Sequence, residues 1–419
     1  MIPMLQATAS PSEVLVARPR FRSLLVRTGI SKLGNAIANF ALPLIILQRS
    51  GSATGMALGV VCECAPHFLF GPFLGALADR VDRRRLLMIS DAAQIVIALL
   101  IAAYLRVFPD STSVWPLYVA CFVTALIDVA YWVVAEFCLV PRLVEERELG
   151  TANSLYFATC TSAAILGPLI GGKLLSYGQP AMVFAFDSLT FVATLTLWMD
   201  LSSEQFGVPS AAARASSTGE RVNEAFKIFF SHEVLLPLFA ALFLSNLGNS
   251  CRTNLLIYHW GKVMGLPKDE LGMRVGMLAM ISIAGNLLSP YLALMAREGR
   301  LFLAHWACTL SLGLLISYTQ SDTGLMLAVI WMELCGSAVW IYTFHARQVF
   351  VPKANLAGVN AIARAVLLAS VSLSSMIFLP LAEKIGVKST MALQGIPLSI
   401  AIVVWACQKR LRNMQLATR

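Results

Sequence analysis

Long, almost uncharged apolar runs recur along the whole 419-residue chain, and they constrain its fold more than any other feature. Hydrophobic residues make up 58% of the sequence and charged residues 13%, whereas soluble domains average about 45–50% and about 25%. A helix needs roughly 20 apolar residues to cross a bilayer. The runs are too long for the roughly ten-residue alternating strands of a membrane β-barrel. The sequence therefore predicts an all-α membrane protein.

Twelve runs are long enough, and each is predicted to be one transmembrane helix. The predicted spans are 22–48, 56–78, 86–107, 115–138, 153–177, 181–201, 234–259, 272–295, 301–319, 324–344, 355–381 and 388–408. The small, polar and mildly basic segment between the sixth and seventh spans is typical of a linker. We expect an N-terminal six-helix bundle over 1–201, a cytoplasmic linker over 202–233 and a C-terminal six-helix bundle over 234–419.

The distribution of Lys and Arg favours an orientation with both termini in the cytoplasm. With the N-terminus inside, the inner segments hold 21 of the 32 Lys and Arg residues and the outer segments hold 8. Cationic residues concentrate on the cytoplasmic side of membrane proteins. The net charge of +9 is explained in this way without a nucleic-acid partner. The absence of any Asn-x-Ser/Thr sequon favours a bacterial inner membrane.

The turn between the second and third spans carries the most specific motif, GALADRVDRRR at 75–85. An acid at a helix end beside several arginines can latch onto a neighbouring helix N-terminus, although a plain basic loop is the alternative. The motif resembles the loop signature Gly-x-Leu-Ala-Asp-Arg-x-Gly-Arg-Arg of the major facilitator superfamily, with Asp82 replacing the second Gly. The resemblance implies that Asp79, Arg80 and Arg83 form a gating latch, and Gly75 adds close helix packing.

This resemblance covers nearly the whole chain, because the number of spans, the position of the linker and the loop all agree. The fifth span contains Gly167-Pro168-Leu169-Ile170-Gly171-Gly172, which is similar to the antiporter motif of the superfamily. Proline and glycine in a helix allow bending and close packing, so we expect a bending element there; a generic kink is the alternative. The stretch 140–153 looks like the branch with macrolide-efflux and enterobactin-export proteins. That branch usually has Gly-Asp in span 1, where this chain has Gly34-Asn35.

Polar side chains form stripes at helical spacing on spans 1, 4, 7 and 10, which line the central cavity in the superfamily. The stripes are Lys32, Asn35 and Asn39; Asp128, Trp132 and Glu136; Asn246, Asn249 and Arg252; and Glu333, Ser337 and Trp340. An ionisable residue at the bilayer centre costs at least ~2.5 kcal/mol unless it is shielded. Lining of a cavity explains the stripes, and contacts between helices are the alternative reading.

We expect Asp128 and Glu136 to carry protons, with Glu63 beside His67 as a further candidate pair. The predicted substrate-binding residues are Lys32, Asn35, Asn39, Trp132, Asn246, Asn249, Arg252, Glu333 and Trp340. Two of these, Lys32 and Arg252, could instead pair with the acids. No metal site is predicted, because Cys62 and Cys64 point different ways on a helix.

The sequence and the resemblance together predict a secondary active transporter, and no catalytic motif predicts an enzyme. We expect a proton-coupled exporter of a small polar organic molecule such as a siderophore or metabolite. A multidrug or macrolide efflux pump is the alternative, followed by a facilitative importer. The expected energy source is the proton gradient, with no cofactor. The expected partners are the substrate and the lipid bilayer, and we expect a monomer.

Overall fold

The computed structural model describes residues 16–78, 82–138, 143–145, 148–200, 218–295, 300, 303–304, 306–307, 309–311, 322–336 and 356–412. All the regular elements within these residues are helices. The prediction of an all-α membrane protein is confirmed.

The N half, residues 1–201, contains helices that follow one another through short turns. They are α2 (Pro19–Ser50), α3 (Ala53–Ala78), α4 (Arg83–Val107), α5 (Trp115–Cys138), α7 (Leu149–Ser176) and α8 (Pro180–Asp200). The C half, from residue 218 onward, has shorter and more broken helices. They are α11 (Thr218–Ser231), α12 (Leu235–Asn249), α13 (Arg252–Tyr258), the π-helix η2 (His259–Val263), α14 (Lys268–Met295), α16 (Asp322–Gly336), α18 (Leu356–Ile385), α19 (Val387–Leu393), α20 (Gly395–Cys407) and α21 (Lys409–Arg412).

The observed helices coincide with the predicted spans wherever the span is described. Spans 7 and 12 are each divided, into α12–α13–η2 and α19–α20. Span 9, 301–319, lies largely outside the described residues, as does the second part of span 10. Within the described part of the chain, seven helices are long and apolar enough to cross a membrane, or eight if a bent pair counts as one span.

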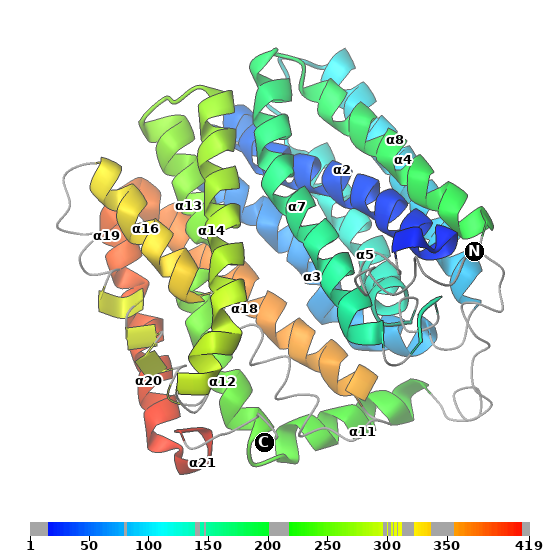
Figure 1. Ribbon diagram of the computed structural model, residues 1–419. Helices are drawn as coiled ribbons and strands as arrows, with labels where there is room; N and C mark the ends of the chain where they lie inside the picture. Colours follow the sequence, from blue (N-terminus) through cyan, green and yellow to red (C-terminus); the bar gives the residue numbers. More distant parts are fainter. Residues whose placement is uncertain are drawn as a thin grey trace, which may run out of the picture.

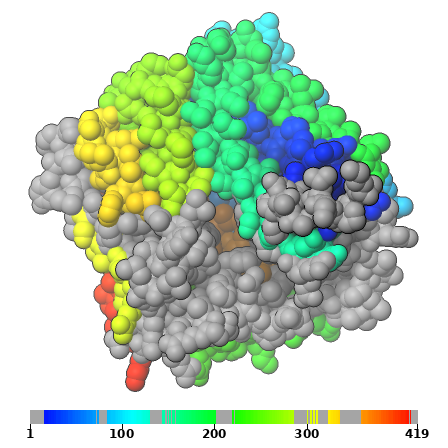
Figure 2. Space-filling view, viewed as in Figure 1, coloured from blue at the N-terminus to red at the C-terminus, as the bar shows by residue number. Residues whose placement is uncertain are grey.

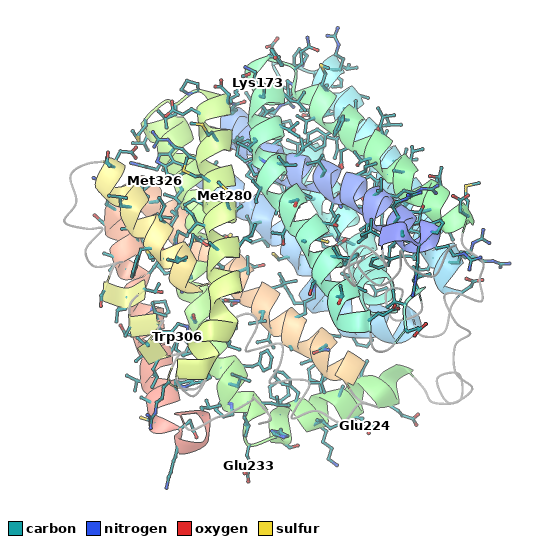
Figure 3. The ribbon with its side chains drawn as sticks, in the orientation of Figure 1. Lys173, Glu224, Glu233, Met280, Trp306 and Met326 are labelled. Atoms are coloured by element: carbon teal, nitrogen blue, oxygen red, sulfur yellow. The ribbon has the colours of Figure 1, made fainter. Side chains whose placement is uncertain are left out.

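Helix α11 was not anticipated by the prediction of a linker over 202–233. The segments 222–231 and 235–263 meet at a bend of 87°, so α11 runs across one end of the bundle (Figure 1). Its Ala225 and Phe229 are almost fully buried against the C half, while Glu224 and Lys227 are exposed. This amphipathic pattern explains why a short polar segment is helical here. Lys173 stands at the opposite end of the bundle from Glu224 (Figure 3), and we call these the Lys173 end and the α11 end.

The two halves contact each other mainly along two helix pairs, α3 with α18 and α7 with α14. Figure 2 shows α14 and α7 in direct contact, above a recess in which atoms of α18 are visible. Within the N half the most extensive helix contacts are those of α4 with α8, α2 with α7 and α3 with α5. Helix α18 therefore packs on the N half as well as on α12 of its own half.

The contact between α7 and α14 is made backbone to backbone through glycines. A Cβ atom added to Gly272 would lie 2.2 Å from the carbonyl oxygen of Pro168 and 3.0 Å from Cα of Gly172. A Cβ atom added to Gly172 would lie 2.5 Å from the carbonyl oxygen of Lys268. Small residues let transmembrane helices approach this closely, so the halves meet tightly at the Lys173 end.

The other face of the same motif packs α7 on α2. A Cβ atom on Gly167 would lie 2.4 Å from Cβ of Ala36, and one on Gly171 would lie 3.1 Å from Cδ1 of Phe40. Helix α7 continues through Pro168 to Ser176. The expected close packing is thus present on two sides of α7, and bending at this motif stays a prediction.

We expect the variant Gly272→Val to separate α7 from α14, because no space exists for its side chain. Overpacking of this kind typically costs about 1–3 kcal/mol, so the apparent Tm of the purified protein should fall. The matched control is Gly71→Val in α3, where an added Cβ atom meets nothing within 4 Å. Thermal unfolding of both variants is measured by tryptophan fluorescence. Equal melting curves for the two variants would contradict the close contact.

Candidate transport site

Asp128 of α5 lies where helices from both halves converge. Its Oδ2 atom is 4.0 Å from Nε2 of His67 on α3 and 4.0 Å from Nη2 of Arg364 on α18. The side chain of Asp128 is 42% exposed, whereas that of His67 is only 8% exposed. An acid of the N half therefore faces an arginine of the C half and remains accessible.

Glu63 belongs to the same cluster. It is one helical turn before His67 on α3, and it is near enough to Asp128 for the two negative charges to repel each other. The Glu63 side chain is exposed, although the residues that follow it on α3 are buried. We call Glu63, His67, Asp128 and Arg364 the acid cluster.

Small residues on α18 let α3 come close enough to build this cluster. Ser370, Ser374 and Ser375 of α18 are fully buried, and among the described elements α18 makes its most extensive helix contact with α3. A stripe of small residues is a common interface between membrane helices. The serine-rich sequence of α18 thus brings its Arg364 beside the acids of the N half.

A second polar group lies within the C half. Nη1 of Arg252 on α13 is 3.1 Å from Oε1 of Glu333 on α16, and Nη2 donates to Oδ1 of Asn249 at 2.7 Å. Ser282 of α14 donates to Oε2 of Glu333 at 2.8 Å. Arg252 is buried and Glu333 is 26% exposed. We call these residues the C-half ion pair; they join four helices of that half, α12, α13, α14 and α16.

The polar stripe of span 1 differs in its surroundings. Lys32 and Asn35 are half-buried on α2, and Asn39 is exposed. The neighbouring Gly34 packs on α8, where an added Cβ atom would lie 2.0 Å from Oγ1 of Thr190 and 2.6 Å from Oδ1 of Asp187. The first stripe therefore borders a tight helix contact inside the N half.

Comparison with known proteins decides the family. The family model of the Major Facilitator Superfamily matches residues 24–364. The chain belongs to the major facilitator superfamily. It is a multi-pass membrane transporter and not an enzyme, and its fold is that of the superfamily.

Several relatives are efflux proteins. Multidrug efflux pump Tap of Mycolicibacterium fortuitum is 23% identical over 92% of this chain and 95% of its own. Macrolide efflux protein A of Streptococcus pyogenes is 24% identical over 42% of this chain, and the Staphyloferrin A transporter of Staphylococcus aureus is 23% identical over 43%. These two matches span less than half of each relative, 44% and 45%.

The solved structures agree on the fold. A bacterial homologue of the iron transporter ferroportin, in an inward-facing state, superposes with a TM-score of 0.70 at 16% identity, covering 93% of this chain and 98% of that one. At this identity the likeness concerns the architecture alone.

The structure brings together some of the predicted site residues and leaves others outside its description. It joins Asp128 with Glu63, and Arg252 with Asn249 and Glu333, while Asn246 lies half-buried on α12. The predicted residues whose side chains lie outside the described part of this transporter are Trp132, Glu136, Trp340, Asp79, Arg80 and Arg83. Gly75 lies in α3. Among the described side chains, Arg252 pairs with Glu333 and not with Asp128; the side chain of Glu136, the other acid of span 4, lies outside the description.

Sequence reasoning missed the contact of Arg364 with Asp128, and it also missed the roles of Asp82 and Ser282. Asp82, which interrupts the loop signature, is the N-cap of α4, and its carboxylate accepts hydrogen bonds from the backbone N–H groups of Arg84 and Arg85. An Asp directly before a helix is a recognisable capping signal. Ser282 gave no comparable signal, because its role depends on Glu333 of another helix.

Removing one member of the C-half ion pair should destabilise the protein more than removing both. Arg252→Met or Glu333→Leu leaves the partner charge unpaired, at a cost of about 1–3 kcal/mol for a pair that is partly exposed. The double variant should recover most of this loss. Thermal melting of the four proteins tests the expectation, and additive losses in the double variant would show that the pair is not coupled.

Proposed function

We propose that this transporter exports a small polar organic molecule, of the siderophore or metabolite class, in exchange for protons. The observation that supports it most is the acid cluster, in which Asp128 is accessible and faces Arg364 of the other half. A proton bound by Asp128 weakens its attraction to Arg364 and relieves its repulsion by Glu63. Proton binding would thus change the attraction between the halves, which is what alternating access requires.

Glu136 of α5 is the second proposed proton carrier, and its spacing from Asp128 places both residues on one face of the helix. It stands two turns after Asp128 in the sequence, towards the α11 end of the helix. Two acids on one face would offer successive positions for a proton along α5.

A polar substrate is favoured by the charged character of both halves. The C-half ion pair and the half-buried Lys32 and Asn35 offer donors and acceptors rather than a purely apolar surface. The proposed substrate-binding residues remain Lys32, Asn35, Asn39, Trp132, Asn246, Asn249, Arg252, Glu333 and Trp340. The similarity to a protein described as a staphyloferrin A transporter is consistent with this class.

Efflux of macrolides or other drugs is the second candidate. It is favoured by the relatives, because the multidrug efflux pump Tap matches along nearly the whole chain. In both cases the transporter would act in the bacterial inner membrane, with one chain as the working unit.

The charges at the α11 end support a cytoplasmic position for it and for both termini. Arg18 binds both carboxylate oxygens of Glu148 at 2.9 and 2.8 Å, and Arg84 donates to the carbonyl oxygens of Trp198 and Met199. These arginines join the ends of helices at the α11 end. In most membrane proteins the side that is richer in Lys and Arg faces the cytoplasm.

The variant Asp128→Asn should uncouple transport from the proton gradient. In proteoliposomes, pH-driven accumulation of the substrate should fall to the level of protein-free liposomes, while exchange of the substrate across the membrane persists. Labelled iron-free staphyloferrin A and labelled erythromycin serve as probes, and they separate the two candidate functions. Glu136→Gln should behave in the same way.

The matched control is Asp110→Asn, an exposed acid in the turn between α4 and α5. It removes the same charge at a distance from the acid cluster and should leave both accumulation and exchange unchanged. Wild-type accumulation by the Asp128→Asn protein would exclude the proposed proton role of Asp128.

A further inference from the structure

The turn between α2 and α3 is held by side chains of the opposite half. Helix α2 ends at Ser50 and is capped by Gly51, which has the left-handed φ of 64°, and α3 begins at Ala53. Ser52 caps α3 locally, because its Oγ atom accepts hydrogen bonds from the N–H groups of Thr54 at 3.0 Å and Gly55 at 3.4 Å. The N–H group of Ala53 is the next donor of this helix end that needs an acceptor.

Glu383, near the end of α18, supplies that acceptor. Its Oε1 atom accepts a hydrogen bond from the N–H group of Ala53 at 2.5 Å. Its Oε2 atom accepts from Oγ1 of Thr54 at 3.2 Å and from Oγ of Ser52 at 3.4 Å. The N-terminus of an N-half helix is therefore completed by a carboxylate of the C half.

Lys262 makes the complementary contact on the other side of the same turn. It lies in the π-helix η2, and its Nζ atom donates a hydrogen bond to the carbonyl oxygen of Gly51. The ammonium group also lies 5.8 Å from the ring centre of Tyr258. π-Helical turns change the direction in which the following side chains point. Here Lys262 lies within the π-helix and contacts the N half at Gly51.

The signs of the two charges match the two helix ends. The end of α2 presents backbone carbonyl groups with partial negative charge, and it meets the cation of Lys262. The start of α3 presents N–H groups with partial positive charge, and it meets the anion of Glu383. Two residues of the C half thus bind the two helix ends that meet at Gly51–Ala53.

We propose that Glu383 and Lys262 form a clasp that keeps the two halves closed at the Lys173 end and must release before they separate there. The clasp lies at the same end as the glycine contact between α7 and α14, because Lys262 is followed within a few residues by Lys268, whose carbonyl oxygen adjoins Gly172. The glycines allow α7 and α14 to pack closely where the halves meet. The clasp supplies an electrostatic attraction that depends on the relative position of the halves.

The exposure of the clasp suits a contact that forms and breaks. Glu383 and Lys262 are exposed, so water replaces their partners when the halves separate. A deeply buried ion pair would leave unpaired charges and would resist opening. Loss of a helix cap or of a charge at a helix end changes an equilibrium constant by roughly three- to tenfold. Here the equilibrium is the one between the closed and open arrangements of the halves.

The distance between the halves at the Lys173 end tests the proposal directly. Spin labels attached through a non-canonical amino acid at Gln179 and Ser389, both exposed, avoid the native cysteines. Pulsed electron–electron distance measurements on the full chain in lipid nanodiscs report the populations of closed and open distances. The double variant Glu383→Ala, Lys262→Ala should raise the open-to-closed ratio by roughly three- to tenfold.

Two further variants make the result specific. Glu383→Gln keeps an oxygen that can accept from Ala53 but removes the charge, so it should shift the ratio less than Glu383→Ala; it also serves as the test protein if the alanine variant does not fold. Lys384→Ala, the next residue on α18, should leave the distances as in the wild type. An unchanged distance distribution in the Glu383 variants would overturn the clasp. The readout needs neither substrate nor proton gradient, so it is independent of the proposed function.

Discussion

Charges inside an apolar solvent must find partners, and this constraint organises the interior of the transporter. Arg252 is buried, and it is paired with Glu333 and Asn249. Asp91 is fully buried between α4 and α8, where its Oδ2 atom accepts a hydrogen bond from Nε1 of Trp198 at 2.7 Å. Because a charge at the bilayer centre is costly without such partners, these two contacts favour the arrangement of the helices that they join.

The same constraint explains the use of small residues at the contacts between the halves. Backbone groups of membrane helices are satisfied within each helix, so helices attract one another mainly by close packing and by a few polar contacts. Gly172 and Gly272 provide the closest approach, between α7 and α14. Buried serines are also frequent in α18, the helix that packs on α3 of the other half. Close packing brings the polar groups within reach, and the polar groups then select one arrangement.

The sequence predicted the helices well and their partners poorly. Apolar length and helical periodicity are local properties, and they located each described span within a few residues. Spacing also pointed to Asp128, Arg252 and Glu333, which lie in polar contacts, whereas the side chains of Trp132, Glu136, Ser337 and Trp340 lie outside the described residues. The partner of Arg252 could not be found in this way, because Glu333 is 81 residues away and the rotation of each helix decides whether they meet. Helix α11 was missed because Phe229 and its neighbours are a short apolar pattern beside a polar segment, and their burial depends on the C half.

The two polar groups differ in what a movement of the halves would do to them. The C-half ion pair joins α12, α13, α14 and α16 of one half, so a rigid movement of that half leaves it intact. The acid cluster joins α3 and α5 with α18, so the same movement changes the distance between Asp128 and Arg364. Only a group that contacts both halves gains or loses interaction energy when the halves move. A ligand such as a proton shifts the equilibrium between two conformations by the difference in its affinity for them. Under the proposed proton coupling, a proton would therefore act on the transport cycle more effectively at Asp128 than at Glu333, whichever substrate is carried.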